Sequence, residues 1–218
     1  ADWAEFYRQL PSSLPPPVPL DSDRKLPMTF VSRSDAETFC RWLTQIERSK
    51  GLLEAGDTYR LPTDDEWSMA AGLPRERGET PADRNDGIVG MYPWGFTWPP
   101  LPVPANLWDA IGAAAKKSKD GIQGFKDGFA ALAPVRSFAP VKSFMDERAE
   151  MFDLAGNVWE WEEGSYGGSD PKLQRLGVVR GGSWRAKDQT ELLASHRRPV
   201  PPSTRSDEIG FRVVLSPA

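Results

Sequence analysis

The chain has 218 residues, a length that one domain can fill and that is enough to bury a substantial hydrophobic core. Charged residues make up 27% with both signs interspersed and a net charge of −4, so no cluster of Lys and Arg indicates a nucleic-acid partner. No stretch approaches the roughly 18 to 20 apolar residues of a membrane-spanning helix, and the N-terminus shows no signal-peptide pattern. We therefore expect one globular domain over 1–218, with no nucleic-acid partner and no membrane span.

Cysteine usage narrows the chemistry and the compartment. Cys40 is the only cysteine, which excludes an internal disulfide, a Cys-rich zinc site and a Cys-x-x-Cys redox pair. A reducing compartment such as the cytoplasm fits this usage. The sequence is also rich in Pro (21), Gly (19) and Trp (9), a mixture typical of an irregular fold with short elements around aromatic anchors.

The first predicted element is an amphipathic helix over 2–10, "DWAEFYRQL". Its apolar residues Trp3, Phe6, Tyr7 and Leu10 follow the i, i+3, i+4, i+7 spacing, and the Pro-rich segment after them ends it. Because the chain opens inside this pattern, we expect it to be the C-terminal part of a longer protein, with an upstream strand and an upstream domain missing.

Two further helices carry capping boxes. The helix that begins at "SDAE" pairs Ser34 with Glu37, and the one that begins at "TDDEW" pairs Thr63 with Glu66. The predicted inward-facing residues are Ala36, Phe39, Cys40, Leu43 and Ile46 in the first of these helices, and Trp67, Ala70 and Ala71 in the second.

Residues 73–145 consist mostly of turn-forming sequence. A loop of this length in a compact domain usually carries function or is fixed by a ligand. Beyond it, "RLGVVRGGSW" and "IGFRVVL" predict strands. The second is expected to place Ile209, Phe211, Val213 and Leu215 on one face.

Acidic and amide residues beside Gly-containing turns suggest calcium sites. Asp153 and Glu160 flank such a turn, so their oxygens could converge with the carbonyls of Gly156 and Val158. Calcium takes 6 to 8 oxygen ligands at about 2.3–2.6 Å. Asn106 and Asp127 offer a second set of oxygens that would fix the long loop. The alternative is that these residues only form turns, as Asn and Asp beside Gly commonly do.

None of the candidate catalytic motifs contains all the residues that a known catalytic site requires. A three-His metal site is excluded because His196 is the only histidine, and its neighbour Ser195 lies in no G-x-S-x-G elbow. "RGGSW" lacks the lysine and helix of a phosphate-binding loop, so a tight bend of a strand is favoured. Trp159, Trp161 and Trp184 could stack on sugars, but the core is the commoner place for Trp in strands.

Seven segments occur in the order found in the formylglycine-generating enzyme (sulfatase-modifying factor) family, which the chain resembles over roughly residues 26–215. They are "FVSRSDAETFCRWL", "YRLPTDDEWSMAAG", "YPWG", "DGF…APVRSF", "MFDLAGNVWEW", "VVRGGSW" and "IGFRVVL". The resemblance implies an α+β, C-type-lectin-like fold with a small, twisted, mostly antiparallel sheet, two main helices and extensive irregular loops.

The resemblance also implies two structural calcium sites. Their ligands would be the Asp153 and Glu160 carboxylates with the carbonyls of Gly156 and Val158 at one site, and Asn106, the Leu107 carbonyl, Asp127 and the Phe129 carbonyl at the other.

The family's catalytic groups do not carry over. Active members bind copper with two cysteines after the "GGS" motif, and the corresponding positions are Ala186 and Glu191. Soft Cu(I) has no thiolate ligands here, and the three-His iron site of sulfoxide-forming relatives is also missing, so we expect neither copper nor iron. The alternative remains a metal-dependent oxidoreductase, or an enzyme of the siderophore-maturation type, without the cysteine pair.

We therefore predict a ligand-binding module. In bacteria, similar domains are appended to signalling modules or serve as variable proteins of diversity-generating retroelements. The mixed-charge, Pro-containing segment 184–208, between two predicted strands, has the character of a binding loop that would contact a protein, although a solvated connection is the simpler interpretation. The candidate contacts are Trp184, Arg185, Lys187, Asp188, His196, Arg198, Arg205 and Glu208.

Overall fold

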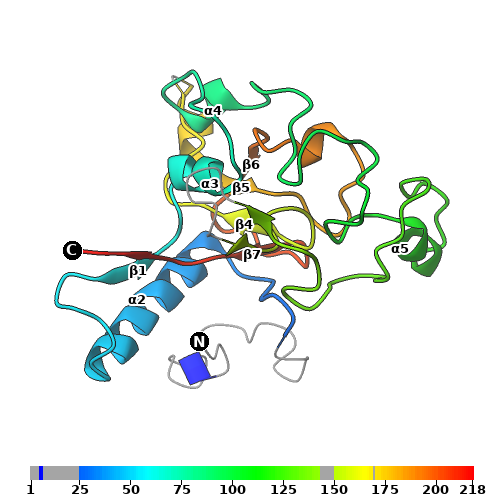
Figure 1. Ribbon diagram of the computed structural model, residues 1–218. Coiled ribbons are helices and arrows are strands. Elements are labelled where there is room, and N and C mark those ends of the chain that lie inside the picture. Colours follow the sequence, from blue (N-terminus) through cyan, green and yellow to red (C-terminus); the bar gives the residue numbers. More distant parts are fainter. Residues whose placement is uncertain (1–4, 7–24, 143–149, 169) are drawn as a thin grey trace.

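The computed structural model describes residues 5–6, 25–142, 150–168 and 170–218 (Figure 1). Of the predicted N-terminal helix, only Glu5 and Phe6 are described, and they are helical. Trp3, Tyr7 and Leu10 lie outside the described residues. In the described part of the chain, no helix has the length and apolar character needed to cross a bilayer.

The longest helix, α2 (Arg33–Ser49), forms where predicted but begins two residues earlier. Its capping box joins Ser32 and Asp35, so the predicted pair Ser34 and Glu37 is wrong. Two overlapping Ser-x-x-acid patterns occur in this stretch, and the chain is already helical at Ser34. The predicted stripe of Ala36, Phe39, Cys40 and Leu43 is buried, whereas Ile46 is half-buried and Thr44 takes a buried position in the next turn.

The second predicted capping box is confirmed. Helix α3 (Asp64–Ala70) begins after Thr63, whose side chain accepts from the Glu66 amide while the Glu66 carboxylate accepts from the Thr63 amide. Trp67 and Ala71 are buried. Between 73 and 140 the chain is mostly turns and irregular backbone, interrupted by the short helices α4 (Pro81–Arg84) and α5 (Ala110–Ala115). Each of these short helices also begins at an acceptor side chain, from Thr80 and Asp109.

A four-stranded sheet lies at the centre of the molecule, in the order β6-β5-β4-β7 (Figure 1). Its strands are β4 (Trp159–Trp161), β5 (Gly177–Arg180), β6 (Arg198–Val200) and β7 (Ile209–Phe211). The β4–β5 and β5–β6 pairs are antiparallel and the β4–β7 pair is parallel. Two small antiparallel sheets join β1 (Thr58–Arg60) to β8 (Val214–Ser216), and β2 (Val141–Lys142) to β3 (Glu150–Met151).

The predicted continuous strand "IGFRVVL" is wrong as one element. It divides into β7, which pairs with β4, and β8, which pairs with β1. The alternation of apolar residues continues across the break, but Leu215 is largely exposed. The break places the Arg212 side chain on Glu160 of β4, where it makes two hydrogen bonds. A local pattern does not show this change of partner strand.

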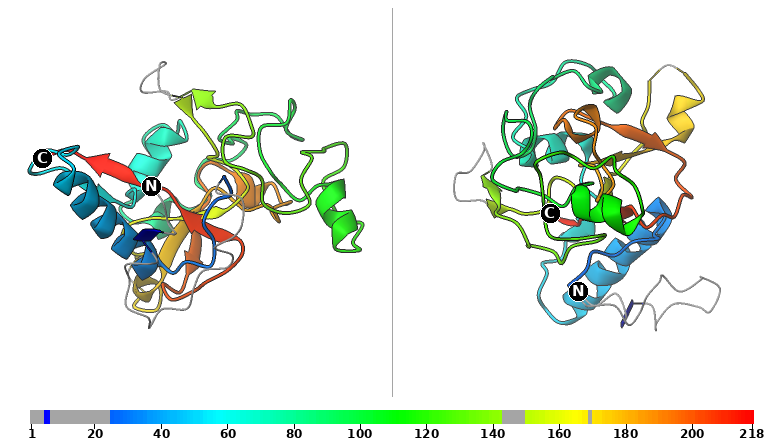
Figure 2. Two further views of the ribbon diagram at one scale, coloured as in Figure 1. Left: turned by 90° about the horizontal axis from the view of Figure 1, so that it is seen from below. Right: turned by 90° about the vertical axis from the view of Figure 1, so that its right-hand side faces the viewer.

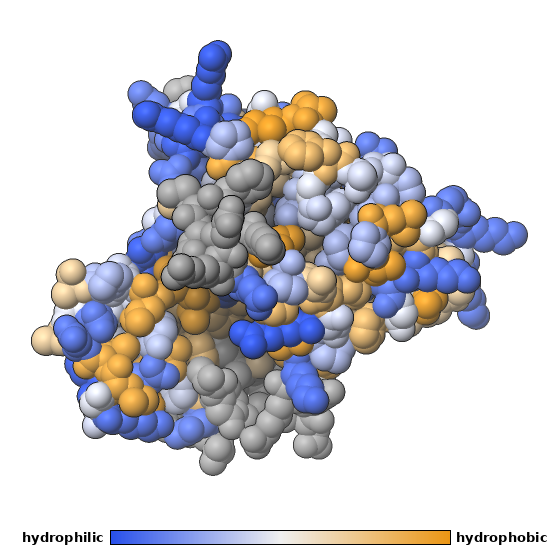
Figure 3. Space-filling model, in the orientation of Figure 1, coloured by the Kyte–Doolittle hydropathy of each residue, from blue (hydrophilic) through white to orange (hydrophobic). Residues whose placement is uncertain are grey.

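Short elements are held together by buried aromatic residues, as predicted. Trp159, Trp161 and Trp184 are all buried, and the Trp161 indole donates to the Val31 carbonyl at 2.9 Å. Figure 2 shows α2 and α5 at opposite ends of the molecule, with the central sheet between them. Figure 3 shows apolar residues in small groups among charged ones on the face it displays.

The turn before β4 requires glycine at position 156. Gly156 has φ +67°, and a Cβ there would lie 2.1 Å from the Asn106 carbonyl oxygen. Asn106 and Gly156 form an isolated bridge, and the Asn157 amide donates to the Asn106 carbonyl at 2.8 Å. This close approach joins the long loop to the "GNVWEW" segment. The two predicted calcium sets, although far apart in the sequence, therefore lie on neighbouring segments of the structure.

Candidate functional site

Segment 184–208 is more ordered than the predicted loop. It leaves β5 through Gly181 and Gly182, which have φ values of +93° and +81° as expected for a tight bend. It then forms a 3-10 helix over Thr190–Leu192 and returns as β6, the edge strand of the central sheet. The candidate contacts before and after β6 are therefore positioned by the sheet.

Trp184, at the start of segment 184–208, is a buried residue and not an exposed contact. Its side chain is in the core, with the residue only 3% exposed, and it packs against Trp108 and Ala113. The indole donates to the Asp207 carbonyl at 3.3 Å, and the Arg185 guanidinium lies 4.3 Å from the ring centroid. Of these two candidate contacts at the start of the segment, Arg185 is therefore the one that is exposed.

Arg185 and Glu208 are brought together across the segment. The Arg185 guanidinium is 2.7 Å from the Asp207 carboxylate and 3.8 Å from that of Glu208. Glu208 also accepts a hydrogen bond from the Ser183 hydroxyl at 2.6 Å. The two ends of the segment thus meet through a small network of charges.

Lys187 and Asp188 face a different part of the chain. Lys187 is paired with Asp120, which also accepts from the Trp108 indole at 3.0 Å. Asp188 is exposed. A cavity of 450 Å³ opens beside both residues, and Trp98 forms another part of its wall. This group combines a charged pair, an exposed carboxylate and an aromatic side chain around one cavity.

The remaining candidates lie apart from that cavity. Arg205 pairs with Asp35 of α2 at 2.7 Å, and His196 Nδ1 lies 2.7 Å from the Asp86 carboxylate. The Arg198 guanidinium covers the buried ring of Trp159 at 5.4 Å. Segment 184–208 therefore presents several separate contacts, of which those at Lys187 and Asp188 border a cavity.

Ala186 and Glu191 are the positions expected to correspond to the family's cysteine pair. Ala186 is buried, and Glu191 is half-buried with a pKa that burial and the neighbouring Asp188 raise. Cys40 lies in α2, where burial raises the pKa of its thiol to about 12.

We expect the Cys40 thiol to be inert in the folded chain, because the nucleophilic thiolate is disfavoured and the sulfur is buried. At about pH 8, Ellman's reagent should leave the native protein unmodified and should titrate one thiol per chain in denaturant. Equal rates in the two conditions would contradict the burial of this side chain.

The Asn106 and Asp127 set contains a half-buried carboxylate that accepts hydrogen bonds from the backbone. Asp127 accepts from the amides of Leu107 and Phe129, each at 2.8 Å, and burial raises its pKa to about 6. No cationic side chain among the described residues forms an ion pair with it. The side-chain nitrogen of Asn106 donates to the Ala131 carbonyl and to the Asn157 side-chain oxygen. The side-chain oxygen of Asn106 is not used in either of these bonds.

The Asp153 and Glu160 set is arranged differently. Both Glu160 oxygens accept from the Arg212 guanidinium at 2.6 Å, and one also accepts from the Trp67 indole at 3.1 Å. Asp153 accepts from the Arg136 amide at 2.8 Å. These residues border a cavity of 350 Å³. Arg212 thus supplies the positive charge that Glu160 requires.

A buried group of arginines and acids was not predicted. Asp64, at the first position of α3, accepts two hydrogen bonds from Arg197, at 2.7 and 3.0 Å, and others from Arg180 and Arg84. Arg197 makes a second two-bond contact with Glu76. Burial opposes ionisation of Asp64, but the hydrogen bonds from Arg197 and the charge of Arg180 outweigh it and lower its pKa.

Glu162 lies beside this group, within ion-pair distance of Arg180 but without a hydrogen bond to it. Its side chain is fully buried, neither carboxylate oxygen accepts a hydrogen bond from any described residue, and an Arg180 nitrogen is 3.6 Å away. Burial raises the pKa of Glu162 to about 8. The three arginines Arg84, Arg180 and Arg197 are already balanced by Asp64, Asp65 and Glu76. A neutral Glu162 fits that balance.

Comparisons with solved structures agree on the fold. Treponema denticola variable protein 1 superposes with a TM-score of 0.61 at 19% identity, over 97% of this chain and 79% of the other. PvdO from Pseudomonas aeruginosa superposes with a TM-score of 0.55 at 21% identity, over 87% of this chain and 61% of the other. The described helices and small sheets therefore form the formylglycine-generating-enzyme type of fold, consistent with a C-type-lectin-like architecture.

Sequence comparisons extend the match to named relatives. The chain is 33% identical to inactive C-alpha-formylglycine-generating enzyme 2 of Mus musculus over 199 residues, which are 88% of this chain and 50% of that protein. It is 28% identical to the formylglycine-generating enzyme of Streptomyces coelicolor, over 85% of this chain and 51% of that protein. The chain thus spans about half the length of these relatives. Because residues 3–217 match the family model of the sulfatase-modifying factor enzyme 1-like domain, this chain belongs to that family.

Proposed function

We propose that this chain is a non-catalytic binding module whose contact surface centres on Lys187 and Asp188. The observation that carries the proposal is the 450 Å³ cavity that these two residues border together with Trp98. Aromatic anchors beside charged groups are typical of protein-binding surfaces, and an arginine, Arg185, lies nearby in the same segment. The partner we propose is a protein, because a surface with charges of both signs suits another mixed surface.

The loss of the copper ligands supports a binding role. Ala186 and Glu191 stand where active members of the family are expected to have cysteines, and Cys40 is buried in α2. The mouse relative at 33% identity is itself named an inactive enzyme. The Treponema relative of the same fold is named a variable protein.

Two paired substitutions test the surface. The variant Lys187→Ala/Asp188→Ala removes the charges beside the cavity, and Asp170→Ala/Lys172→Ala removes the same two residue types from an exposed turn elsewhere. Both changes should leave the fold intact, because all four side chains are exposed and an exposed ion pair such as Lys187–Asp120 contributes only about 0–1 kcal/mol. The immobilised chain is exposed to a soluble extract of its source organism, and retained proteins are quantified by mass spectrometry.

We expect a protein that the parent and the Asp170/Lys172 variant retain equally and that the Lys187/Asp188 variant loses by about ten-fold. If the same proteins remain on all three chains, the surface at Lys187 is not the binding site. Tight stoichiometric uptake of Cu(I), measured by chelator competition, would instead favour a metal-dependent enzyme.

We also propose that calcium stabilises this scaffold at Asn106 and Asp127, with the carbonyls of Leu107 and Phe129 as further ligands. These residues fit the ion, because Asp127 is a half-buried carboxylate with backbone donors and no cationic partner among the described side chains. The Asp153 and Glu160 set, with the carbonyls of Gly156 and Val158, fits less well. There a calcium ion would compete with the two hydrogen bonds from Arg212.

Chelation tests the proposed ion. Saturating a site at about 100 times its Kd adds about 2.7 kcal/mol, which corresponds to about 5–10 °C in the Tm of a domain of this size. We expect EGTA to lower the Tm of the parent and of Glu160→Gln, and to have no effect on Asp127→Asn. A chelator response that survives in Asp127→Asn would place the ion elsewhere, and no response in the parent would exclude a stabilising ion.

A further inference from the structure

A large cavity lies away from segment 184–208. Its volume is about 1240 Å³, and every described residue that borders it falls between Asp65 and Phe96. The binding function proposed above makes no use of this groove. Sites for single small molecules are typically about 300–1,000 Å³, so this groove is large enough for a segment of polypeptide.

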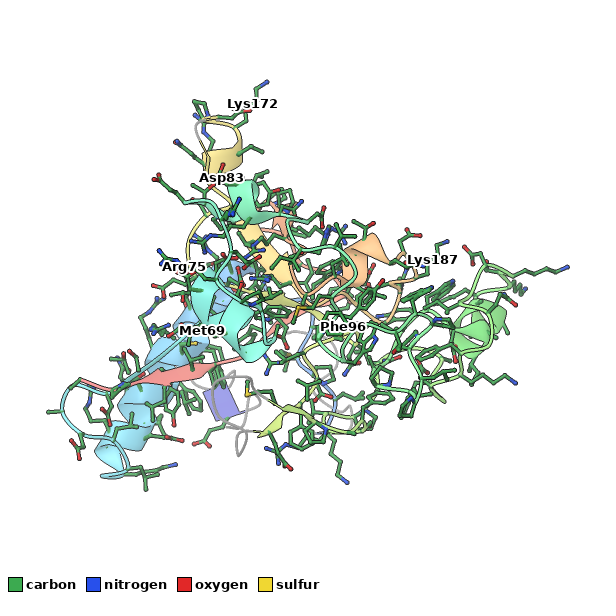
Figure 4. All side chains as sticks on the ribbon, turned by 45° about the horizontal axis from the view of Figure 1, so that its top comes forward. Met69, Arg75, Asp83, Phe96, Lys172 and Lys187 are labelled. Carbon is green, nitrogen blue, oxygen red and sulfur yellow. The ribbon has the colours of Figure 1, made fainter. Side chains whose placement is uncertain are left out.

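The walls of the groove are mainly apolar. Leu73 and Met91 form buried parts of the wall, whereas Met69 and Phe96 are 45% and 73% exposed. Figure 4 shows Met69 and Arg75 beside α3, with Phe96 across from them. Met side chains adapt to different apolar partners, and aromatic side chains are common anchors of interfaces.

One wall is held rigid by the buried ion group. Glu76 is fixed by two hydrogen bonds from Arg197 and one from the Ser68 hydroxyl. Arg84 donates to the Gly78 carbonyl at 3.0 Å and to Asp64 at 2.9 Å, so the loop after α3 is tied to the helix itself. A wall fixed in this way loses little conformational freedom on binding, which favours affinity.

The charges available at the rim of the groove favour an acidic partner. Arg75 and Arg77 are exposed, border the groove and form no ion pair with any described residue. Glu79 is the one exposed acid of this loop at the rim, and Asp65 is already paired with Arg84. Two cations against one acid leave these rim residues with a net positive charge.

We propose that this groove binds an extended segment of a partner protein that carries apolar side chains flanked by carboxylates. The apolar side chains fill the space between Met69 and Phe96, and the carboxylates pair with Arg75 and Arg77. Such a site is separate from the surface at Lys187 and Asp188, so the chain has two faces for protein partners.

A displayed library of random dodecapeptides, selected against the whole chain, tests this site. The expected result is an enriched motif of large apolar residues with Asp or Glu beside them. A labelled peptide with that motif, measured by fluorescence anisotropy, should bind the parent at least about ten-fold more tightly than Arg75→Glu/Arg77→Glu and than Phe96→Ser.

Matched variants separate the groove from general effects of charge and apolar surface. Lys172→Glu/Arg175→Glu reverses two exposed cations outside the groove, and Val89→Ser removes an exposed apolar residue that does not border it. Both should bind the peptide as the parent does. A selection that yields no acidic-apolar motif, or a motif peptide that binds the groove variants as tightly as the parent, overturns the proposal.

Discussion

Replacement of Asp64 by Asn should destabilise the fold by about 3–5 kcal/mol, because it removes the carboxylate that the buried Arg180 and Arg197 share. Glu76 is then left as the remaining hydrogen-bonded acid of Arg197. The Asp64 carboxylate accepts two hydrogen bonds from Arg197 and one from Arg180, and both of these side chains are fully buried. Asn keeps the shape of the side chain but presents amide hydrogens to a cationic group. Denaturation in urea, followed by Trp fluorescence at neutral pH, measures the change in the free energy of unfolding.

Asp65→Asn is the matched control. Both acids lie in the first turn of α3, so both substitutions remove a similar favourable interaction with the helix dipole. The Asp65 side chain is 74% exposed and pairs only with Arg84, so its loss should cost less than about 1 kcal/mol. If the two variants unfold at the same urea concentration, the buried ion group contributes nothing specific to stability.

The sequence identifies the helix that carries Asp64 but not the role of this residue. In the sequence, Asp64 and its neighbour Asp65 both have the pattern of ordinary acidic residues in the first turn of a capped helix. Arg180 and Arg197, the partners of Asp64, are more than 100 residues away along the chain. The one local signal is Arg180, a charged residue directly after the buried pair Val178 and Val179 of β5. Such a residue is buried only with a partner, and the sequence does not say which.

Periodicity and capping predicted elements well and partners poorly. The apolar stripes of α2 and α3 follow from spacing, and the burial of Trp159 and Trp161 follows from the preference of Trp for the core. The division of "IGFRVVL" into β7 and β8 does not, because both halves keep the same alternation while pairing with strands β4 and β1. The choice between overlapping capping boxes at the start of α2 depends on the extended backbone of Ser32.

For the candidate site too, the sequence predicted the position of the segment but not its contacts. Segment 184–208 stands out in the sequence by its polar composition, and its position between β5 and β7 was predicted. The return of the chain through β6 depends on pairing with β5. The burial of Trp184 and the cavity beside Lys187 depend on contacts with Trp98, Trp108 and Asp120 of the long loop. These contacts have no local signature, so the sequence does not rank the eight candidate residues.

The stability of the parent should fall as the pH rises, because Glu162 is buried without a hydrogen-bond donor. Burial raises the pKa of Glu162 to about 8, whereas an unfolded Glu titrates near 4.3. Between these two values the unfolded chain releases a proton that the folded chain keeps, so folding becomes less favourable. The stability that is fully present below about pH 4 is lost progressively up to about pH 8, at a rate of up to about 1.4 kcal/mol per pH unit.

Glu162→Gln removes this titration while it keeps the size of the side chain. Gln stands in for the neutral acid, and the balance of Arg84, Arg180 and Arg197 by other acids is unchanged. We expect the variant to match the parent near pH 5 and to be more stable by about 2–3 kcal/mol near pH 7.5. Urea denaturation across this pH range provides the measurement. Parallel profiles for the two proteins would show that Glu162 is ionised in the fold and that its charge is compensated by Arg180, contrary to the neutral state expected from the unpartnered oxygens.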